Sequence, residues 1–306
     1  MGTIARVTLG LVARDPFDTS PLDPAWTVVA GSVGQGNMDA DGFIRMGTST
    51  TRATMRRTEA GAPTDAILVW TDNGQVGPAD RNLNALLRFD VAAGDQYDIN
   101  HFVFSAQGDF EVRKVDGGVV ALIDGTPFDQ PSGWRAKRLI IAEAGGQVTV
   151  TGRAAAASGA ATTKARGNDL TLDPTAVGPV QVIDGTPLPN TTLHQFSGRG
   201  HQVGHWFWCG RDVVVTGLPA GFSVELDGPV VTRAPVSPVA GVATVDVDTF
   251  ALPITTVRVL NAASVIDAEI TPADGVWGGD VYEYSGGAGG AAAAGAPFSR
   301  ARLGFF

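Results

Sequence analysis

Short runs of β-branched and aromatic residues, separated by turn-forming residues, recur along most of this chain. In the first half they are AILVWT (66–71), ALLRF (85–89), YDINHFVF (97–104), FEVRKV (110–115), VVALI (119–123), RLIIA (138–142) and QVTVTG (147–152). Runs of this length and spacing are typical of the strands of a sandwich or barrel, in which every strand needs a neighbour for its backbone hydrogen bonds. The sequence therefore predicts an all-β fold without long helices.

A second set of such runs follows residue 210, and it indicates a second module. Its members are DVVVTG (212–217), FSVEL (222–226), VATVDV (242–247) and TTVRVL (255–260). Prolines fall between these runs, where a missing N–H is tolerated. The 306 residues are enough for about two domains, and the small polar stretch at 153–178 predicts the linker between them.

Composition and charge exclude several classes of function. The net charge is −9, and because phosphate binding depends on clustered Lys and Arg, nucleic acid is excluded as a partner. No run approaches the 18 or more apolar residues of a membrane-spanning helix, and MGTIARVTLGLVARDPFD lacks the apolar core of a signal peptide. The single cysteine, Cys209, excludes an internal disulfide.

The stretch HQFSGRGHQVGHWFWCGRD (194–212) concentrates the residues that bind metals: it holds three of the four histidines and the only cysteine. On an extended strand, residues four positions apart are about 13 Å apart, too far to share one ion. The stretch is therefore interpreted as a core strand at the seam between the two modules. His194 is interpreted as a surface or capping histidine. No metal or other cofactor is expected, although loop residues Asp95, Asp98, Asp109 and Asp116 leave a calcium site open.

No set of residues predicts an enzyme. A glycan hydrolase needs paired carboxylates, and the closest pair, Glu225 and Asp227, lacks a second glutamate on its run. Cys209 has no adjacent base or glycine elbow. The tryptophans serve either as core anchors or as surface platforms for sugars. For a glycan-binding role the candidates are Trp134 and Trp277, which lie beside turns, and Tyr282.

The last residues form a separate segment. SGGAGGAAAAGAP predicts a flexible tether, and FSRARLGFF follows it. Either the end is frayed, or it docks on a neighbouring subunit through Phe298, Leu303, Phe305 and Phe306.

Three segments carry a resemblance to known proteins: DPFDTSPLDPAWTVVAGSV (15–33), FEVRKVDGGVVALI (110–123) and WRAKRLIIAEAGGQVTVTG (134–152). They resemble the LamG-like, concanavalin-type jelly roll, and the runs after 210 look like a small immunoglobulin-like sandwich. The expected domains are a jelly roll at 1–170, an immunoglobulin-like module at 178–285, and a tether with a docking peptide at 286–306.

The order of the two modules, with VWGGDVYEY (276–284) and a Gly/Ala tail at the end, is similar to minor tail proteins of tailed actinobacteriophages. The resemblance implies a virion structural protein, assembled in the host cytoplasm, whose partners are copies of itself, other virion proteins and host-surface polysaccharide. The alternatives are a capsid decoration protein or head fibre, and a glycan-active hydrolase.

Overall fold

The computed structural model contains strands and turns, and no helix among the residues it describes. Those residues are 1–15, 17, 22–38, 41–48, 50–59, 65–73, 81–87, 92–93, 95–104, 107–117, 119–128, 134–144, 147–154, 180–184, 193–228, 235–247 and 254–286. Within this part of the chain, nothing helical is long and apolar enough to cross a membrane. The predicted all-β class is confirmed.

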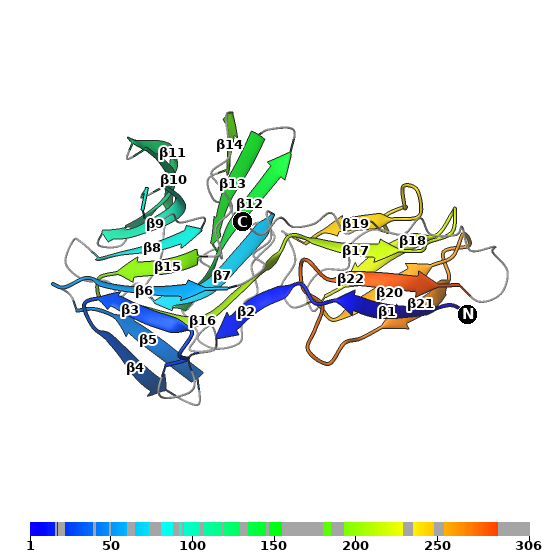
Figure 1. Cartoon of the computed structure of the whole chain (residues 1–306), viewed down its shortest axis with the longest axis horizontal. Helices are drawn as coiled ribbons and strands as arrows, with labels where there is room; N and C mark the ends of the chain where they lie inside the picture. Colours follow the sequence, from blue (N-terminus) through cyan, green and yellow to red (C-terminus); the bar gives the residue numbers. More distant parts are fainter. Residues whose placement is uncertain are drawn as a thin grey trace.

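The larger unit consists of two antiparallel sheets (Figure 1). One has seven strands in the order β11 (Val119–Phe128), β10 (Gln107–Asp116), β9 (Gln96–Phe104), β8 (Arg81–Leu87), β15 (Leu193–Gly198), β6 (Ala53–Thr58) and β3 (Trp26–Ala30). The other has eight: β14 (Val180–Asp184), β13 (Gln147–Ala154), β12 (Trp134–Ala144), β7 (Ala66–Asn73), β16 (His201–Gly210), β5 (Asp41–Met46) and β4 (Val33–Met38), with β2 (Leu11–Asp15) also paired to β16.

The two sheets pack against each other through large apolar side chains. The rings of Trp26 and Phe196, both on the seven-stranded sheet, lie with their centroids 6.0 Å apart. The Trp26 ring also contacts Trp206 of the eight-stranded sheet, at a centroid distance of 5.0 Å. All three are buried, as are Met55 and Ile44. The unit is the expected jelly-roll sandwich.

The smaller unit is an immunoglobulin-like sandwich of seven strands. Its four-stranded sheet has the order β1 (Thr3–Thr8), β22 (Val281–Ser285), β17 (Asp212–Thr216) and β19 (Ala243–Asp246). Its three-stranded sheet has the order β18 (Ser223–Asp227), β20 (Thr256–Leu260) and β21 (Ile266–Ile270). Val213 and Val215 of β17 are buried while their neighbours are half-buried, which is the alternation expected of a strand with one face on a core.

The boundaries between the two units differ from the predicted ones at 170 and 178. Strands β14, β15 and β16, which run from Val180 to Gly210, belong to the sheets of the jelly roll. The first strand, β1, instead pairs with β22 at the other end of the chain, so the immunoglobulin-like unit is built from both ends of the sequence (Figure 1). Alternation along a run predicts a strand and its buried face, but not the partner with which it pairs.

Candidate functional site

The two sandwiches meet at a joint formed by four glycines. The chain passes from β1 to β2 through Gly10 and from β16 to β17 through Gly210, and the turn Gly278–Gly279 lies against both. The Gly210 amide donates to the Gly278 carbonyl at 2.9 Å, and the Gly279 amide donates to the Asp212 carbonyl at 2.7 Å. Backbone hydrogen bonds thus join the end of the jelly roll to the second sandwich.

Glycine is required at this joint because the backbones approach too closely for a side chain. A Cβ atom on Gly210 would lie 2.7 Å from the Gly279 Cα, and one on Gly278 would overlap the Gly210 carbonyl oxygen. Gly279 also has a φ of +89°, which favours glycine. The WGGD sequence at 277–280 is therefore explained by close packing between the sandwiches.

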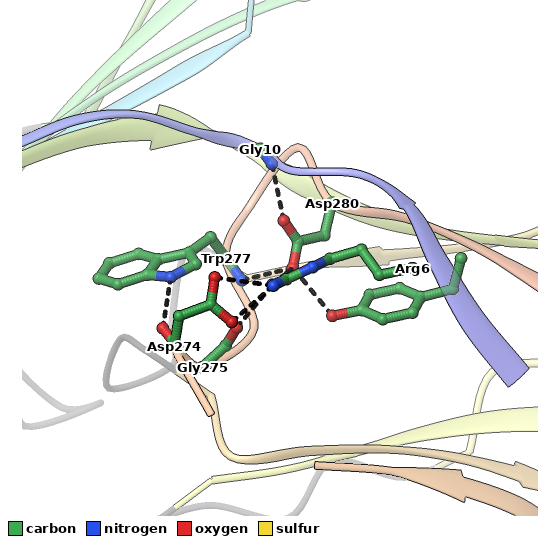
Figure 2. Close-up of polar contacts among 7 residues, drawn as sticks. Arg6, Gly10, Asp274, Gly275, Trp277 and Asp280 are labelled. Carbon is green, nitrogen blue, oxygen red and sulfur yellow. Dashed lines mark hydrogen bonds and ion pairs between the residues drawn. The ribbon is translucent and has the colours of Figure 1, made fainter. Parts of the chain in front are cut away.

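Asp280 lies at the centre of the joint (Figure 2). Its side chain is 0% exposed, and its carboxylate accepts hydrogen bonds from the amides of Gly10 (2.7 Å) and Trp277 (3.1 Å) and from the Tyr282 hydroxyl (2.9 Å). The Arg6 guanidinium lies 3.3 Å from the same carboxylate. A buried charge is stable only when it is paired and hydrogen-bonded, and all of these partners come from segments that meet here.

Arg6 of β1 connects this carboxylate to the surface. It donates to both oxygens of Asp274, at 2.5 and 2.7 Å, and to the Gly275 carbonyl at 2.9 Å (Figure 2). Burial opposes the charge on Arg6, but the hydrogen bonds to Asp274 and Asp280 prevail, so the pKa of Arg6 is raised. The hydrogen bonding between Arg6 and Asp274 also lowers the pKa of the Asp274 carboxyl.

Trp277 joins the cores of the two sandwiches. Its ring meets Phe207 of β16 edge-on, with centroids 4.9 Å apart, and its indole N–H donates to the Asp274 carbonyl at 2.9 Å. One continuous group of buried side chains includes Ile67, Ile140 and Phe207 of the jelly roll together with Trp277 and the core of the second sandwich. The joint is therefore a packed core as well as a hydrogen-bond network.

Two of the three residues expected to bind glycans are parts of this joint. Trp277 is 1% exposed and Tyr282 is 0% exposed, so neither ring offers a face to a sugar, and the expectation for both is corrected. The physical reason is that the turn beside Trp277 is closed by the jelly roll. Trp134 is the first residue of β12, paired with Asn73, and its side chain lies outside the described part, as do Phe298, Leu303, Phe305 and Phe306.

The histidine-rich stretch lies in the core, but it forms two strands, β15 and β16, in different sheets rather than the single core strand expected. Trp206, Phe207, Trp208 and Cys209 of β16 are all buried, because both faces of the strand are covered. His194 on β15 is 0% exposed and stacks on Trp206 at 5.2 Å, so its interpretation as a surface or capping histidine is wrong. The described side chains include no group of three potential metal ligands; those of His201 and His205 are outside that set.

Four of the six acidic residues considered for hydrolysis and for calcium have structural partners. Arg258 lies 3.0 Å from Glu225 and 2.8 Å from Asp227, and it also pairs with Glu269 across the three-stranded sheet. Asp95 accepts the Gly117 amide at 2.8 Å, and Asp116 pairs with Lys114. The side chains of Asp98 and Asp109 lie outside the described set.

Sequence reasoning missed the residues that complete the joint, Arg6, Gly10 and Gly210. Arg6 and Asp280 are 274 positions apart, and no local pattern links them. The only available signal was the WGGD sequence, whose adjacent glycines mark a close backbone approach. Chemically, the described polar groups of the joint hydrogen-bond one another, so the arrangement fixes two sandwiches together.

Comparisons with known proteins give fold-level similarities only. No protein-family model matches the chain, and no curated protein matches it. The CBM2 module of the evolved Dit of Lactobacillus casei BL23 phage J-1 has a TM-score of 0.43 and 12% identity, over 65% of this chain and 94% of that one. Lectin II from Ulex europaeus has a TM-score of 0.42 and 11% identity, over 64% and 97%.

The carbohydrate-binding module CBM66 from Bacillus subtilis has a TM-score of 0.32 and 12% identity, over 61% of this chain and 92% of that one. With TM-scores below 0.5, these similarities identify neither a family nor a ligand. The relation to phage tail proteins stays a prediction.

Proposed function

We propose that this chain is a structural protein of a tailed phage, a minor tail protein that assembles with copies of itself and contacts host-surface polysaccharide. The observation that carries the proposal is the joint. Two sandwiches are fixed to each other by close-packed glycines and by a carboxylate that is 0% exposed. A part of a particle needs a fixed shape, and this joint supplies one.

The groups at the joint support a structural role over a catalytic one. The Asp280 carboxylate is occupied by four donors from its own chain. A catalytic carboxylate needs a free lone pair directed at a substrate. Glu225, the residue considered for hydrolysis, is held by Arg258. These contacts favour the structural role over the hydrolase alternative.

The proposal can be tested on intact phage particles. Antibody against the whole chain, labelled with gold and applied to intact phage particles, is expected to mark the tail. Label on the head would favour the alternative of a capsid decoration protein or head fibre. Absence of the chain from purified particles would contradict both.

A glycan contact through Trp134 is the second part of the proposal. We expect the whole protein to bind host polysaccharide on a glycan array and Trp134→Ala to weaken that binding. Val239→Ala, which shortens an exposed side chain of the second sandwich, serves as the control. Equal binding by the wild type and Trp134→Ala would remove Trp134 from the site.

The terminal segment is proposed to dock on a neighbouring subunit. Arg300 and Arg302 lie between its apolar residue Phe298 and the later apolar residues Leu303, Phe305 and Phe306. Deleting residues 286–306 is expected to reduce incorporation into particles without changing the melting temperature of the two sandwiches. Normal incorporation of the shortened chain would refute the docking role.

A further inference from the structure

Strand β1 lies at the edge of the four-stranded sheet. It pairs with β22 on one side, and no strand among the described residues pairs with it on the other side. An edge strand leaves a row of amides and carbonyls without a strand partner, and such a row can pair with a further strand. The free edge of β1 therefore has the backbone groups that an extended segment needs for docking.

The pairing of β22 shows which backbone groups of β1 face outward. The Val214 amide of β17 donates to the Asp280 carbonyl at 2.9 Å, so the backbone groups of Asp280 and of Tyr282, two residues on, point to β17. The backbone groups of Glu283 therefore point to β1, where its partner is Ala5. The residues on either side of Ala5 direct their amides and carbonyls to the free edge.

The Gly2 amide shows the same direction. It donates to Asp267 of β21 at 2.7 Å and not to β22. Because amides alternate along a strand, those of Ile4 and Arg6 point to this side as well. The side chain of Ile4 belongs to the core and that of Arg6 to the joint, so these two residues offer their backbone groups to a partner.

Carboxylates line the middle of this edge. Asp267 lies beside Gly2, and Asp274 lies beside Arg6. Arg6 pairs with Asp274, whereas Asp267 accepts from neutral donors, the Tyr284 hydroxyl and the Gly2 amide. These hydrogen bonds lower the pKa of Asp267. Its negative charge is therefore present at neutral pH and can pair with a cation.

Exposed apolar side chains lie at both ends of the edge. Ile266 precedes Asp267 at one end, and Val7 and Leu9 lie at the other; all three apolar residues are exposed. The seven steps from Gly2 to Leu9 cover about 24 Å on an extended strand. The edge thus has an apolar, acidic, apolar order along its length.

The sequence of the terminal segment, residues 298–306, has a matching order. The segment lies outside the described residues, and its sequence FSRARLGFF places Arg300 and Arg302 between apolar residues. Phe298 and Phe305 are also seven residues apart, which is about 24 Å on an extended strand. When such a strand lies along β1, apolar ends meet apolar ends and arginines meet carboxylates.

The tether begins beside this edge. Ser285, the last residue of β22, pairs with Thr3 at the start of β1. The 12 residues 286–297 can span about 40 Å when fully extended, which is longer than the edge itself. The segment can therefore reach the same edge of a copy that lies next to it.

We propose that residues 298–306 of a neighbouring copy pair with the free edge of β1 as a further strand. The amides and carbonyls of Ile4 and Arg6 take the backbone hydrogen bonds, and Asp267 pairs with an arginine of the segment. The apolar residues of the segment contact the exposed apolar ends of the edge. This inference rests on the proposed docking of the terminal segment and adds the surface that receives it.

Amide hydrogen exchange tests the pairing residue by residue. The Ile4 and Arg6 amides are expected to exchange about tenfold or more slowly in the full chain than in a chain that ends at Gly286, because only the full chain has the docking strand. Ala5 is the internal control, since its amide faces β22 in both chains. Equal rates at Ile4 and Arg6 in the two chains would overturn the inference.

A mixing experiment identifies the chain that supplies the segment. Isotope-labelled chain ending at Gly286 is mixed with unlabelled full chain, and exchange is followed by NMR on the labelled protein alone. The unlabelled full chain should slow exchange at Ile4 and Arg6. If these amides are protected in labelled full chain but never in the mixture, the segment covers its own chain, and the inference is overturned.

Charge variants of the unlabelled chain test the pairing with Asp267. The double variant Arg300→Glu and Arg302→Glu should give less protection in the mixture, because it replaces attraction by repulsion. Arg45→Glu is the control, since Arg45 is an exposed arginine on β5 of the other sandwich, and it should protect as the wild type does. Equal protection by the double variant and the control would overturn the charge pairing.

Failure of this inference differs from failure of the proposed function. If deletion of residues 286–306 lowers incorporation into particles without changing exchange in β1, the segment docks elsewhere, and β1 is overturned as its receptor. Absence of the chain from phage particles contradicts the proposed function, whereas slowed exchange in the mixture still supports the pairing with β1.

Discussion

Asp280 is the residue on which the joint depends most. Its carboxylate is 0% exposed and is surrounded by two backbone amides, a phenol hydroxyl and a guanidinium. Removing this carboxylate leaves donors without an acceptor, and an unsatisfied buried donor costs more than the net contribution of one hydrogen bond.

The first prediction compares Asp280 with Asp274, which pairs with the same arginine. Asp280→Asn is expected to lower the free energy of unfolding by about 1–3 kcal/mol, because the NH2 group of asparagine replaces an oxygen that accepts from N–H and O–H donors and leaves at least one of them unsatisfied. Asp274 is 51% exposed, so Asp274→Asn should cost below about 1 kcal/mol. Urea denaturation of both variants gives the comparison. An equal decrease in the free energy of unfolding for the two variants would show that Asp280 does not carry the buried charge.

The second prediction concerns pH. Burial, and the hydrogen bond to Asp267, raise the pKa of Tyr284 to about 12, whereas an unfolded tyrosine has a pKa of about 10. This group therefore adds stability that is fully present below pH 10 and is lost as the pH rises toward 12, because the unfolded chain releases its proton first.

Absorbance at 295 nm should show an ionisation near pH 12 that Tyr284→Phe removes. The variant should also lose less stability than the wild type as the pH rises from 10 to 12. Some pH dependence should remain, since the pKa of Tyr282 is also raised by burial and by Asp280. An ionisation of Tyr284 near pH 10 in the folded protein would contradict its placement.

The sequence predicted burial better than it predicted partners. Trp26 stands in the apolar run AWTVVA (25–30), a position that predicts burial, and it is buried in the structure. Trp277 was expected at the surface because glycines follow it, and glycines often mark an exposed turn. In the structure the turn is closed by Gly10 and Gly210, which are more than 60 residues away in sequence, so no local pattern contains this information.

At the scale of elements, β1 is the strand that the sequence placed in the wrong unit. It pairs with β22, which lies near the other end of the sequence. Its apolar residues are not equivalent: Ile4 is 9% exposed and belongs to the core, whereas Val7 is 56% exposed. One strand thus offers a buried and an exposed position for the same substitution.

The third prediction uses these two positions. Ile4→Ser is expected to destabilise the protein by about 2–4 kcal/mol, because it removes buried methyl groups and buries a hydroxyl. Val7→Ser should change stability by less than about 0.5 kcal/mol. Amide hydrogen exchange along β22 should rise in Ile4→Ser only. If both variants exchanged alike, β1 would not be part of this sheet.

At the scale of the whole molecule, the two sandwiches share one core. Phe207 and Cys209 at the end of β16 belong to the same group of buried side chains as Val213 and Trp277. Cys209 is the only cysteine of the chain and is 0% exposed. Its thiol therefore reports whether the joint is closed.

The fourth prediction is that Gly278→Ala opens the joint. The new methyl group would overlap the Gly210 carbonyl oxygen, so the backbones must separate, and Cys209 should react faster with a thiol reagent under native conditions. Gly34→Ala is the control, because nothing lies within 4 Å of a Cβ atom at Gly34. Equal labelling rates in the two variants would show that the joint tolerates the added methyl group.

The central claim is that the joint makes the two sandwiches one rigid unit, and differential scanning calorimetry tests it most directly. The whole chain is expected to unfold in a single transition, since a shared core couples the two sandwiches, and Gly278→Ala should split that transition in two. Two separate transitions in the wild-type protein would show that the sandwiches unfold independently and would contradict the claim.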